Sequence, residues 1–427
     1  MPEAARAIQR TYLVLTLFTT LAASFIWGIN TLFLLDAGLD NTQAFAVNAF
    51  FTVGQVLFEI PTGVVADTRG RRLSFLLGSG TLMVATLLYL VMWQVHAGLA
   101  AWAIASILLG LGFTFFSGAT TAWLVDALDA TGFEGPLESI FARAQIVSGA
   151  AMLTGALLGG VIAQATGLGV PYLIRAALLG ITILIAMRSM HDIGFEPIRG
   201  TSVRAEVQAV VRGSIDNGLR NPPVRWLMLA APFTFGVAIY AFYAFQPYLL
   251  ELYGDPTAYG IAGLAAAVIA GAQIAGGIIV PRARLLFRRR TDVLIIGGIA
   301  TALILGLVGL TNNVVLALVL LVAWSLIFAI EGPLRQALIN GLIASEHRAP
   351  VLSFENLMGS AGGVIAQPAL GRVADANGYA ASYLVAAGVQ ALSVPFLILA
   401  RREKPSSDPI AQHDPPIPDA AEPRVST

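Results

Sequence analysis

The stretch GVVADTRGRR, residues 63–72, places four charged side chains within six residues. The 427-residue chain around it is 57% hydrophobic and only 12% charged, with a mean hydropathy of +0.77. Soluble proteins carry about 25% charged residues, so this composition argues against a soluble fold. Apolar runs of roughly 20 residues flank the stretch, and that length crosses about 30 Å of hydrocarbon as a helix. We therefore interpret it as a short loop between two membrane-spanning helices.

Apolar runs of this length recur along the whole chain. Backbone groups inside a membrane must bond within their own segment, which favours helices, and the runs lack the alternation of barrel strands. The first run is too long for a signal-peptide core and counts as a permanent span. We expect an all-α integral membrane protein with twelve transmembrane helices in two pseudo-symmetric six-helix bundles, at roughly 12–35, 43–66, 73–95, 98–126, 145–165, 171–190, 226–249, 258–280, 292–311, 313–337, 350–372 and 380–400.

A long polar stretch divides these spans into six and six. Within it, residues 202–215 fit either an amphipathic surface helix or a plain linker, and we favour the linker. Weak repeats relate the halves: GATTAWLVDAL (118–128) aligns with GPLRQALINGL (332–342), and LGGVIAQATGLGVPYL (158–173) with LGRVADANGYAASYL (370–384). The predicted domains are an N-terminal bundle (1–190), a cytoplasmic central linker (191–225), a C-terminal bundle (226–402) and a disordered cytoplasmic tail (403–427).

Basic residues predict the orientation in the membrane. Of the 25 Lys and Arg, Arg175 lies within a span and Arg372 at the outer edge of one, and the others fall on one side. This bias predicts a multi-pass protein of the cell (inner) membrane with both termini in the cytoplasm. Cysteine is absent, so the sequence offers no disulfide framework and no thiolate metal site.

The charges of the opening stretch have the wrong sign for their own helices. Asp67 ends one span and Arg71 and Arg72 begin the next, where the helix dipole disfavours an acid and a cation respectively. Gly63 lies one turn before Asp67 and would let another helix approach it, and Gly70 permits the tight turn. Membrane anchoring by the arginines alone would explain neither feature, so we expect a specific inner-face latch.

The stretch resembles the signature loop of the major facilitator superfamily, Gly-x-Leu-Ala-Asp-Arg-x-Gly-Arg-Arg/Lys, at the same place between spans two and three. Val65 replaces the usual Leu and Thr68 the usual Arg. The resemblance implies two rocking halves with alternating access, and a loop that bridges the halves and locks the outward-facing state. The corresponding stretch VPRARLLFRRR (280–290) lacks the aspartate, so the latch would be asymmetric. The implied inner gate comprises Gly63, Asp67, Arg69, Gly70, Arg71, Arg72 and Asp126.

Two carboxylates inside predicted spans are candidate proton or coupling sites. Glu331 lies four residues before Arg335, a spacing that favours a structural ion pair over proton carriage. Glu59 has no opposite charge at helical spacing, so it is the better proton-site candidate, with pairing to a distant arginine as an equal alternative.

The resemblance also implies a central cavity lined by spans one, four, seven and ten. Mostly apolar and aromatic walls suit an amphipathic or neutral organic molecule, although any one aromatic side chain is more simply explained by packing. The cavity candidates are Trp27, Asn30, Thr31, Thr121, Tyr240, Tyr243, Gln246 and Trp324.

Glycines in spans five, eight and eleven allow close helix packing, and the resemblance implies that these spans lie where the two halves meet. GALLGG (155–160) partly resembles the span-five motif of superfamily antiporters, with Ala156 in place of its proline. The candidate packing positions are Gly155, Gly159, Gly160, Gly276, Gly277, Gly359 and Gly363.

Together these features predict a monomeric secondary transporter for a small organic molecule in the lipid bilayer. We expect proton-coupled, drug-efflux-like export by antiport. Uptake of a metabolite or sugar, by proton symport or facilitated diffusion, is the alternative, and a non-transporting membrane receptor a remote one. We expect no enzyme, cofactor, metal or nucleic-acid partner, because the single lysine, Lys404, lies in no phosphate-binding loop and no catalytic motif is present.

Overall fold

The structure is a computed structural model that describes residues 3–116, 118–197, 203–283 and 286–410. These residues are almost entirely helical, which confirms the predicted all-α class. The first half comprises α1 (Glu3–Ser24), α2 (Asn30–Asp36), α3 (Asn41–Arg69), α4 (Arg71–Gln94), α5 (Leu99–Thr114), α6 (Ala119–Ala130), α7 (Leu137–Thr166) and α8 (Gly169–Ser189). The linker holds α9 (Val203–Ser214), and the second half comprises α10 (Pro222–Tyr253), α11 (Tyr259–Ala283), α12 (Arg290–Leu310), α13 (Val314–Asn340), α14 (Arg348–Ala391) and α15 (Ser393–Arg402).

Ten helical stretches of the described chain are long and apolar enough to cross a membrane. The last of them, Arg348–Arg402, is 55 residues long and contains Gly378 in a non-helical conformation, so two helical segments are joined there. Helix α1 is not among the ten. The total of twelve spans stays a prediction.

Two spans that the sequence predicts as continuous are broken. In the first, α1 ends at Ser24 and α2 begins at Asn30; in the fourth, α5 ends at Thr114 and α6 begins at Ala119. Hydropathy does not register such breaks, because the intervening residues are as apolar as the helices. Irregular backbone at membrane depth is tolerated where it is buried in protein or lines a cavity, so the breaks point to a functional region.

Two predicted loops are ordered. The linker forms helix α9, whose end is held to α14 where the Ser214 hydroxyl donates to the Pro350 carbonyl at 2.9 Å, so the preference for a plain linker is wrong. The start of the predicted tail, 403–410, packs on α12: the Thr291 amide donates to the Asp408 carboxylate at 2.8 Å and satisfies the helix terminus. Residues 411–427 lie outside the described residues.

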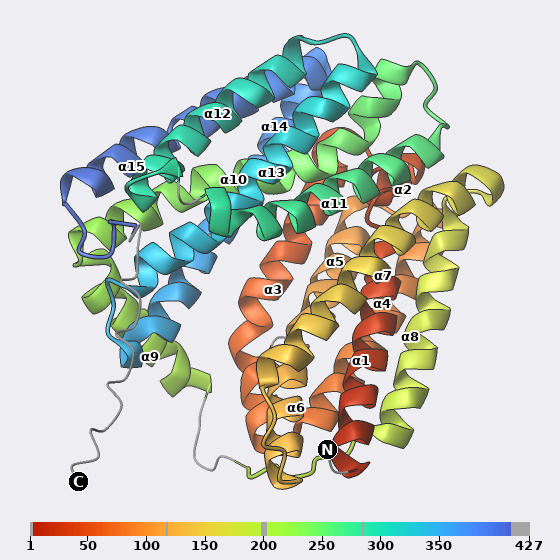
Figure 1. The fold of residues 1–427 in the computed structure, drawn as a ribbon. Helices are drawn as coiled ribbons and strands as arrows, with labels where there is room; N and C mark the ends of the chain where they lie inside the picture. The colour runs from red at the N-terminus through yellow and green to blue at the C-terminus, as the bar shows by residue number, and fades with distance from the viewer. Residues whose placement is uncertain (1–2, 117, 198–202, 284–285, 411–427) are drawn as a thin grey trace, which may run out of the picture.

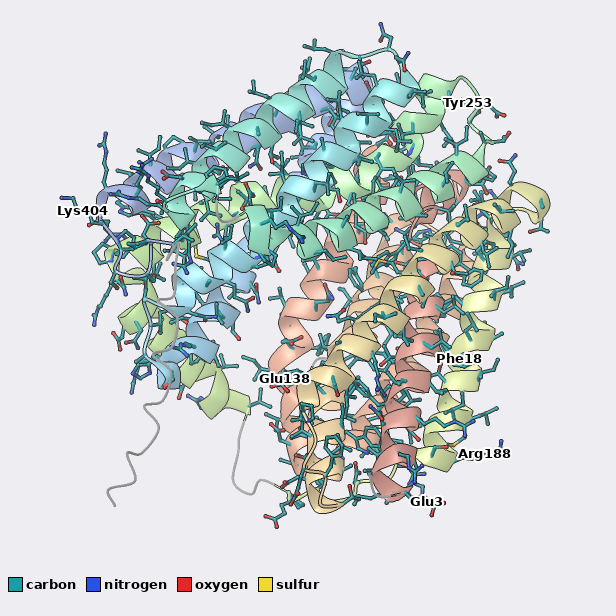
Figure 2. The ribbon with its side chains drawn as sticks, in the orientation of Figure 1. Glu3, Phe18, Glu138, Arg188, Tyr253 and Lys404 are labelled. Carbon is teal, nitrogen blue, oxygen red and sulfur yellow. The ribbon has the colours of Figure 1, made fainter. Side chains whose placement is uncertain are left out.

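The two bundles form the arms of a V (Figure 1). They meet where α7 packs on α11 and α3 on α14, and they diverge toward α6 in one arm and α9 in the other. In Figure 2, Glu3 and Arg188 mark the free end of the first arm and Lys404 that of the second, whereas Tyr253 lies near the junction. Following the predicted orientation, we call the joined end the outer end and the divergent end the inner end.

Candidate functional site

The seam between α7 and α11 is a contact of backbone on backbone at the outer end. A Cβ added at Gly160 would lie 2.6 Å from the Cα of Gly263, and one added at Gly28 would lie 2.9 Å from the same atom. Only residues without a side chain allow helices to approach this closely. Beside this contact the Gly260 amide, in the first turn of α11, donates to Gln164 Oε1 at 3.1 Å.

The seam between α3 and α14 is closed by a helix cap that crosses between the halves. The amides of Asn41 and Thr42, the first residues of α3, donate to the Asp375 carboxylate at 2.9 and 2.8 Å. The Thr42 hydroxyl donates to the same carboxylate, and the Tyr379 hydroxyl donates to the Asn41 side chain. The carboxylate thus satisfies unpaired amides at the positive end of the α3 dipole.

A third group of bonds joins the halves beside the broken first span. The Thr31 amide donates to Gln246 Oε1 at 2.8 Å, and the Gln246 amide nitrogen donates to the Trp27 carbonyl at 2.7 Å. The Thr31 hydroxyl donates to the Tyr243 carbonyl at 2.9 Å. Backbone groups released by the break are therefore satisfied from the opposite half.

Residues of these outer seams share a sequence pattern with the signature loop. GVIAQATG (160–167) and GRVADANG (371–378) follow the pattern of GVVADTRG (63–70), with Gly at both ends and Ala fourth. The fifth residues, Gln164 and Asp375, accept amides of the opposite half, and Asp67 is their counterpart at the inner end. Comparing span ends of opposite orientation would have revealed the pattern.

The space around the first glycine of each copy of the pattern shows which end of the molecule is closed. At the outer end, added Cβ atoms would lie 2.6 Å from Cα of Gly263 for Gly160, and 2.8 Å from the Asn41 carbonyl for Gly371. At the inner end, an added Cβ would meet no atom within 4 Å at Gly63, nor at Gly277, which begins a more diverged copy. Equivalent surfaces are packed at one end and open at the other.

Within the described part of the chain, the hydrogen bonds and ion pairs of the signature loop reach the first half and the start of the linker, not the second half. Arg71 pairs with Asp67, and its Nε lies 3.8 Å from Asp126 Oδ2. The Arg72 amide donates to Asp192 Oδ1 at 2.8 Å, an acid that the sequence analysis did not select. The expected bridge between the halves is therefore not formed in this structure, because the arms diverge here; the side chain of Arg69 is exposed.

A cavity of about 280 Å³ lies at the junction of the arms, next to the broken first span. Trp27, within the break, and Asn30, the first residue of α2, line it from the first half, and Phe242 and Tyr243 line it from the second. Four further helices of the first half complete the walls. They contribute Asn48, Phe51 and Gln55 (α3), Tyr89 (α4), Leu109 and Phe113 (α5) and Arg175 (α8), and Ile26 of the break adds to them.

The other cavity candidates lie elsewhere. Thr31 and Gln246 belong to the outer seam described above. The Tyr240 hydroxyl bonds Ser382 at 2.5 Å in the core of the second half, and Thr121 is exposed on α6. Trp324 lines a smaller cavity within the second half. The expected contribution of span ten to the central cavity is therefore replaced by spans two, three and six.

Most of the predicted packing glycines pack within one half instead of between halves. An added Cβ would contact α1 at Gly155 and Gly159, Ala329 of α13 at Gly276, and α10 at Gly359 and Gly363. Of the predicted set, Gly160 lies on the seam between the halves, and Gly277 meets no atom within 4 Å in this structure.

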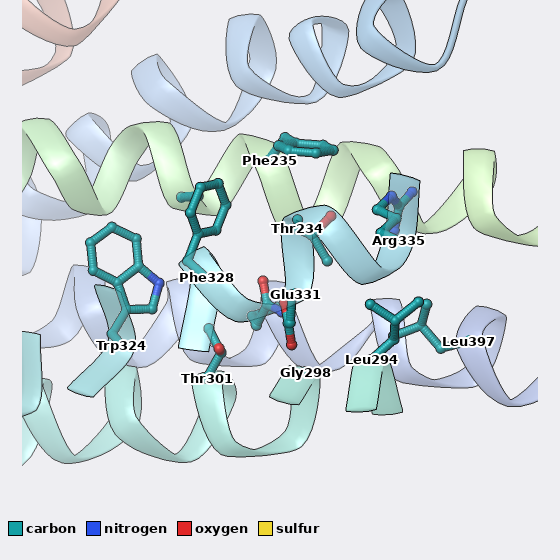
Figure 3. A pocket seen from close by; sticks show the side chains of 13 residues that line it. Thr234, Phe235, Leu294, Gly298, Thr301, Trp324, Phe328, Glu331, Arg335 and Leu397 are labelled. Carbon is teal, nitrogen blue, oxygen red and sulfur yellow. The ribbon is translucent and has the colours of Figure 1, made fainter. Parts of the chain in front are cut away.

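Glu331 lines the smaller cavity without the ion pair that its spacing predicts. Arg335 instead pairs with Glu355 across 2.6 Å, and both side chains are buried. Glu331 Oε1 is buried with no hydrogen-bond partner among the described residues, and Figure 3 shows the side chain beside Thr301 and Gly298, with Arg335 further along the cavity. An unpaired carboxyl inside a membrane helix is costly and marks a functional candidate.

Glu59 lies on α3 with an exposed side chain. Its role as a proton site stays a prediction.

Comparisons with known proteins place this geometry in a fold family. The most similar structures include the nucleoside transporter NupG, with 12% identity and a TM-score of 0.77 over 92% of this chain and 99% of that one. The POT-family transporter PepTSo has 13% identity and a TM-score of 0.70, over 94% and 99% of the two chains. No curated protein matches the sequence at a significant level. The model of the Major Facilitator Superfamily matches residues 12–330 and 283–424, and the chain therefore belongs to that superfamily.

Proposed function

We propose that this protein is a proton-coupled secondary transporter that moves a small polar organic molecule by alternating access. The observation that carries the proposal is the state of the repeated glycines. Gly160 and Gly371 are packed at the outer end, while Gly63 and Gly277 face open space at the inner end. If the helices packed at the inner glycines and separated at the outer ones, the cavity would open to the opposite side of the membrane.

The lining of the central cavity favours uptake of a metabolite over export of a lipophilic drug. Asn30, Asn48, Gln55 and Arg175 give it more polar groups than the sequence led us to expect, and such groups bind specific polar partners. We propose twelve spans, an inner-membrane location with cytoplasmic termini, and function as a monomer.

Glu331 is our proposed proton site in place of Glu59. Its buried, unbonded oxygen can take up a proton in one state and lose it when the second half moves, because Gly297 and Thr301 of α12 confine it here. The cavity around it, about 50 Å³, is large enough to admit water as a path for the proton.

The test is proton flux in proteoliposomes that contain a pH-sensitive dye. A panel of polar metabolites and lipophilic drugs is added outside wild type, Glu331→Gln and Glu59→Gln. Substrate-triggered acidification of the lumen indicates symport, and alkalinisation indicates export by antiport. We expect a metabolite to acidify the lumen, Glu331→Gln to abolish the signal and Glu59→Gln to retain it. A signal that persists in Glu331→Gln would rule out that residue as the proton site.

A further inference from the structure

Arg175 is a buried cation on α8 that no acid neutralises. Its residue is 2% exposed, and among the described residues no carboxylate forms an ion pair with it. Nε donates to the Thr86 hydroxyl at 3.1 Å, and the guanidinium lies 5.9 Å from the ring centre of Phe113. The described residues give its two terminal nitrogens no hydrogen bond. Ionisable residues at membrane depth are costly, so an unneutralised arginine there requires a role.

The central cavity contains a second uncommitted donor. Asn48 Oδ1 accepts from Asn30 Nδ2 at 2.9 Å, and Asn48 Nδ2 is buried with no acceptor among the residues that the structure describes. Tyr172 donates to Asn30 Oδ1 at 3.0 Å, so the orientation of Asn30 is fixed. Arg175 and Asn48 line the same cavity, where Arg175 is the single formal charge. The lining that the described residues form therefore offers one unneutralised cation and a buried amide donor without an acceptor, and it contains no carboxylate to neutralise the cation.

We propose that the central cavity binds a small organic anion, whose carboxylate or phosphate group is held by Arg175 and Asn48. This inference rests on the proposed transport function and specifies its substrate class. The planar guanidinium matches the paired oxygens of either group. Trp27 and Phe242, whose ring centres are 5.9 Å apart in an edge-to-face contact, would hold a compact aromatic or apolar body. At about 280 Å³ the cavity is at the small end of ligand pockets, so the anion is small.

The absence of cysteine allows a test that needs no known substrate. Gln55→Cys places a single thiol on the cavity wall, and Asn312→Cys places one on an exposed outer loop as a control. Each is reacted with methanethiosulfonate reagents that carry either a sulfonate or a trimethylammonium group. An unneutralised arginine attracts the first reagent and repels the second, so the sulfonate-to-ammonium rate ratio reads the local potential.

We expect this ratio to be about ten-fold higher at Gln55→Cys than at Asn312→Cys. Arg175→Gln should abolish the difference, and Arg175→Lys should restore it because the charge returns. A structural arginine that lines the cavity would give the same ratio, so the ratio tests the uncompensated charge and the ligand protection described below tests the binding role. An equal ratio at the two thiols would overturn the proposal.

The ligand class is tested by protection of the cavity thiol from the reagent. Benzoate, phenyl phosphate and the neutral benzamide have similar bodies and differ in the head group. We expect one or both anions to slow the reaction in the Arg175 protein and not in Arg175→Gln, and benzamide to have no effect. Protection by benzoate alone identifies a carboxylate site, and by phenyl phosphate alone a phosphate site. Protection by benzamide, or by neither anion, would overturn the proposal. These assays measure binding without transport, so a protein that binds anions but moves no substrate would refute the transport function alone.

Discussion

At the scale of single residues, the two acids near Arg335 differ in their bonding: Glu331 lines the smaller cavity, and Glu355 is paired with the arginine. Glu355 is fully committed to Arg335, which also donates to the Leu227 carbonyl at 2.6 Å, whereas Glu331 has a buried oxygen without a donor. Glu331 lies one helical turn before Arg335 on α13, and Glu355 of α14 forms an ion pair with the same arginine. The arginine therefore fixes the inner end of the second half and leaves Glu331 available for a changing charge.

The Arg335–Glu355 pair predicts a specific pattern of stability. Arg335→Met should lower the stability of the folded state by about 3–5 kcal/mol, because it leaves Glu355 buried and unpaired. The double variant Arg335→Met, Glu355→Leu should recover most of that loss, since neither charge then remains. Thermal unfolding of the purified proteins in detergent measures both effects. A double variant as unstable as the single one would show that the pair contributes through something other than charge.

At the scale of elements, the outer end is held by helix termini of one half and polar side chains of the other. The α3 terminus is capped by Asp375, and the α11 terminus contacts Gln164. Each bond depends on the arms being together, so caps that normally stabilise one helix here stabilise one conformation of the molecule.

Removing the charge of the α3 cap should therefore shift the conformation more than the fold. We expect Asp375→Asn, which keeps one acceptor oxygen but loses the negative charge, to weaken outer closure by about 0.3–1 kcal/mol, the range for a charge at a helix terminus. Spin labels on cysteines placed at the outer loops of the two halves would report a longer distance. Asp255→Asn is the control, because Asp255 is an outer-loop acid whose bonds are to Thr257 alone among the described residues. An equal shift in both variants would contradict the assignment of the cap.

At the scale of the whole molecule, the same substitution should act in opposite directions at the two ends. Gly160→Val would clash with Gly263 and favour the outward-open state, whereas Gly63→Val meets open space here and would obstruct inner closure. Cysteines at Glu138 and Arg402, both exposed, would carry labels across the inner opening. We expect a shorter distance in Gly160→Val and an unchanged or longer one in Gly63→Val. Gly388→Val, at an exposed site with no neighbour within 4 Å, should change nothing.

The sequence predicts the helical membrane class because composition and apolar runs depend on no tertiary contact. It does not predict the breaks near Gly28 and Gly118, since hydropathy averages over them. The sequence shows Arg175 only as a basic residue within an apolar span. It does not predict that Arg175 lines a cavity, because the neighbouring residues in the sequence are apolar. Asp375 lies within a repeat that the sequence does reveal, but its likeness to Asp67 is hidden because the span before residues 371–378 runs the opposite way through the membrane to the span before residues 63–70.

The recurrence of one pattern at both ends has a consequence for the energy of the resting protein. In the proposed cycle, each end state forms one set of seam contacts and loses a related set. The free energies of the two end states should therefore be similar. Moving one elementary charge across a membrane potential of 100 mV is worth about 2.3 kcal/mol, comparable with a lost cap. If alternating access operates as proposed and one charge moves with the arms, voltage alone would reset which face of the membrane the empty transporter presents, and the direction of transport would respond to the membrane potential.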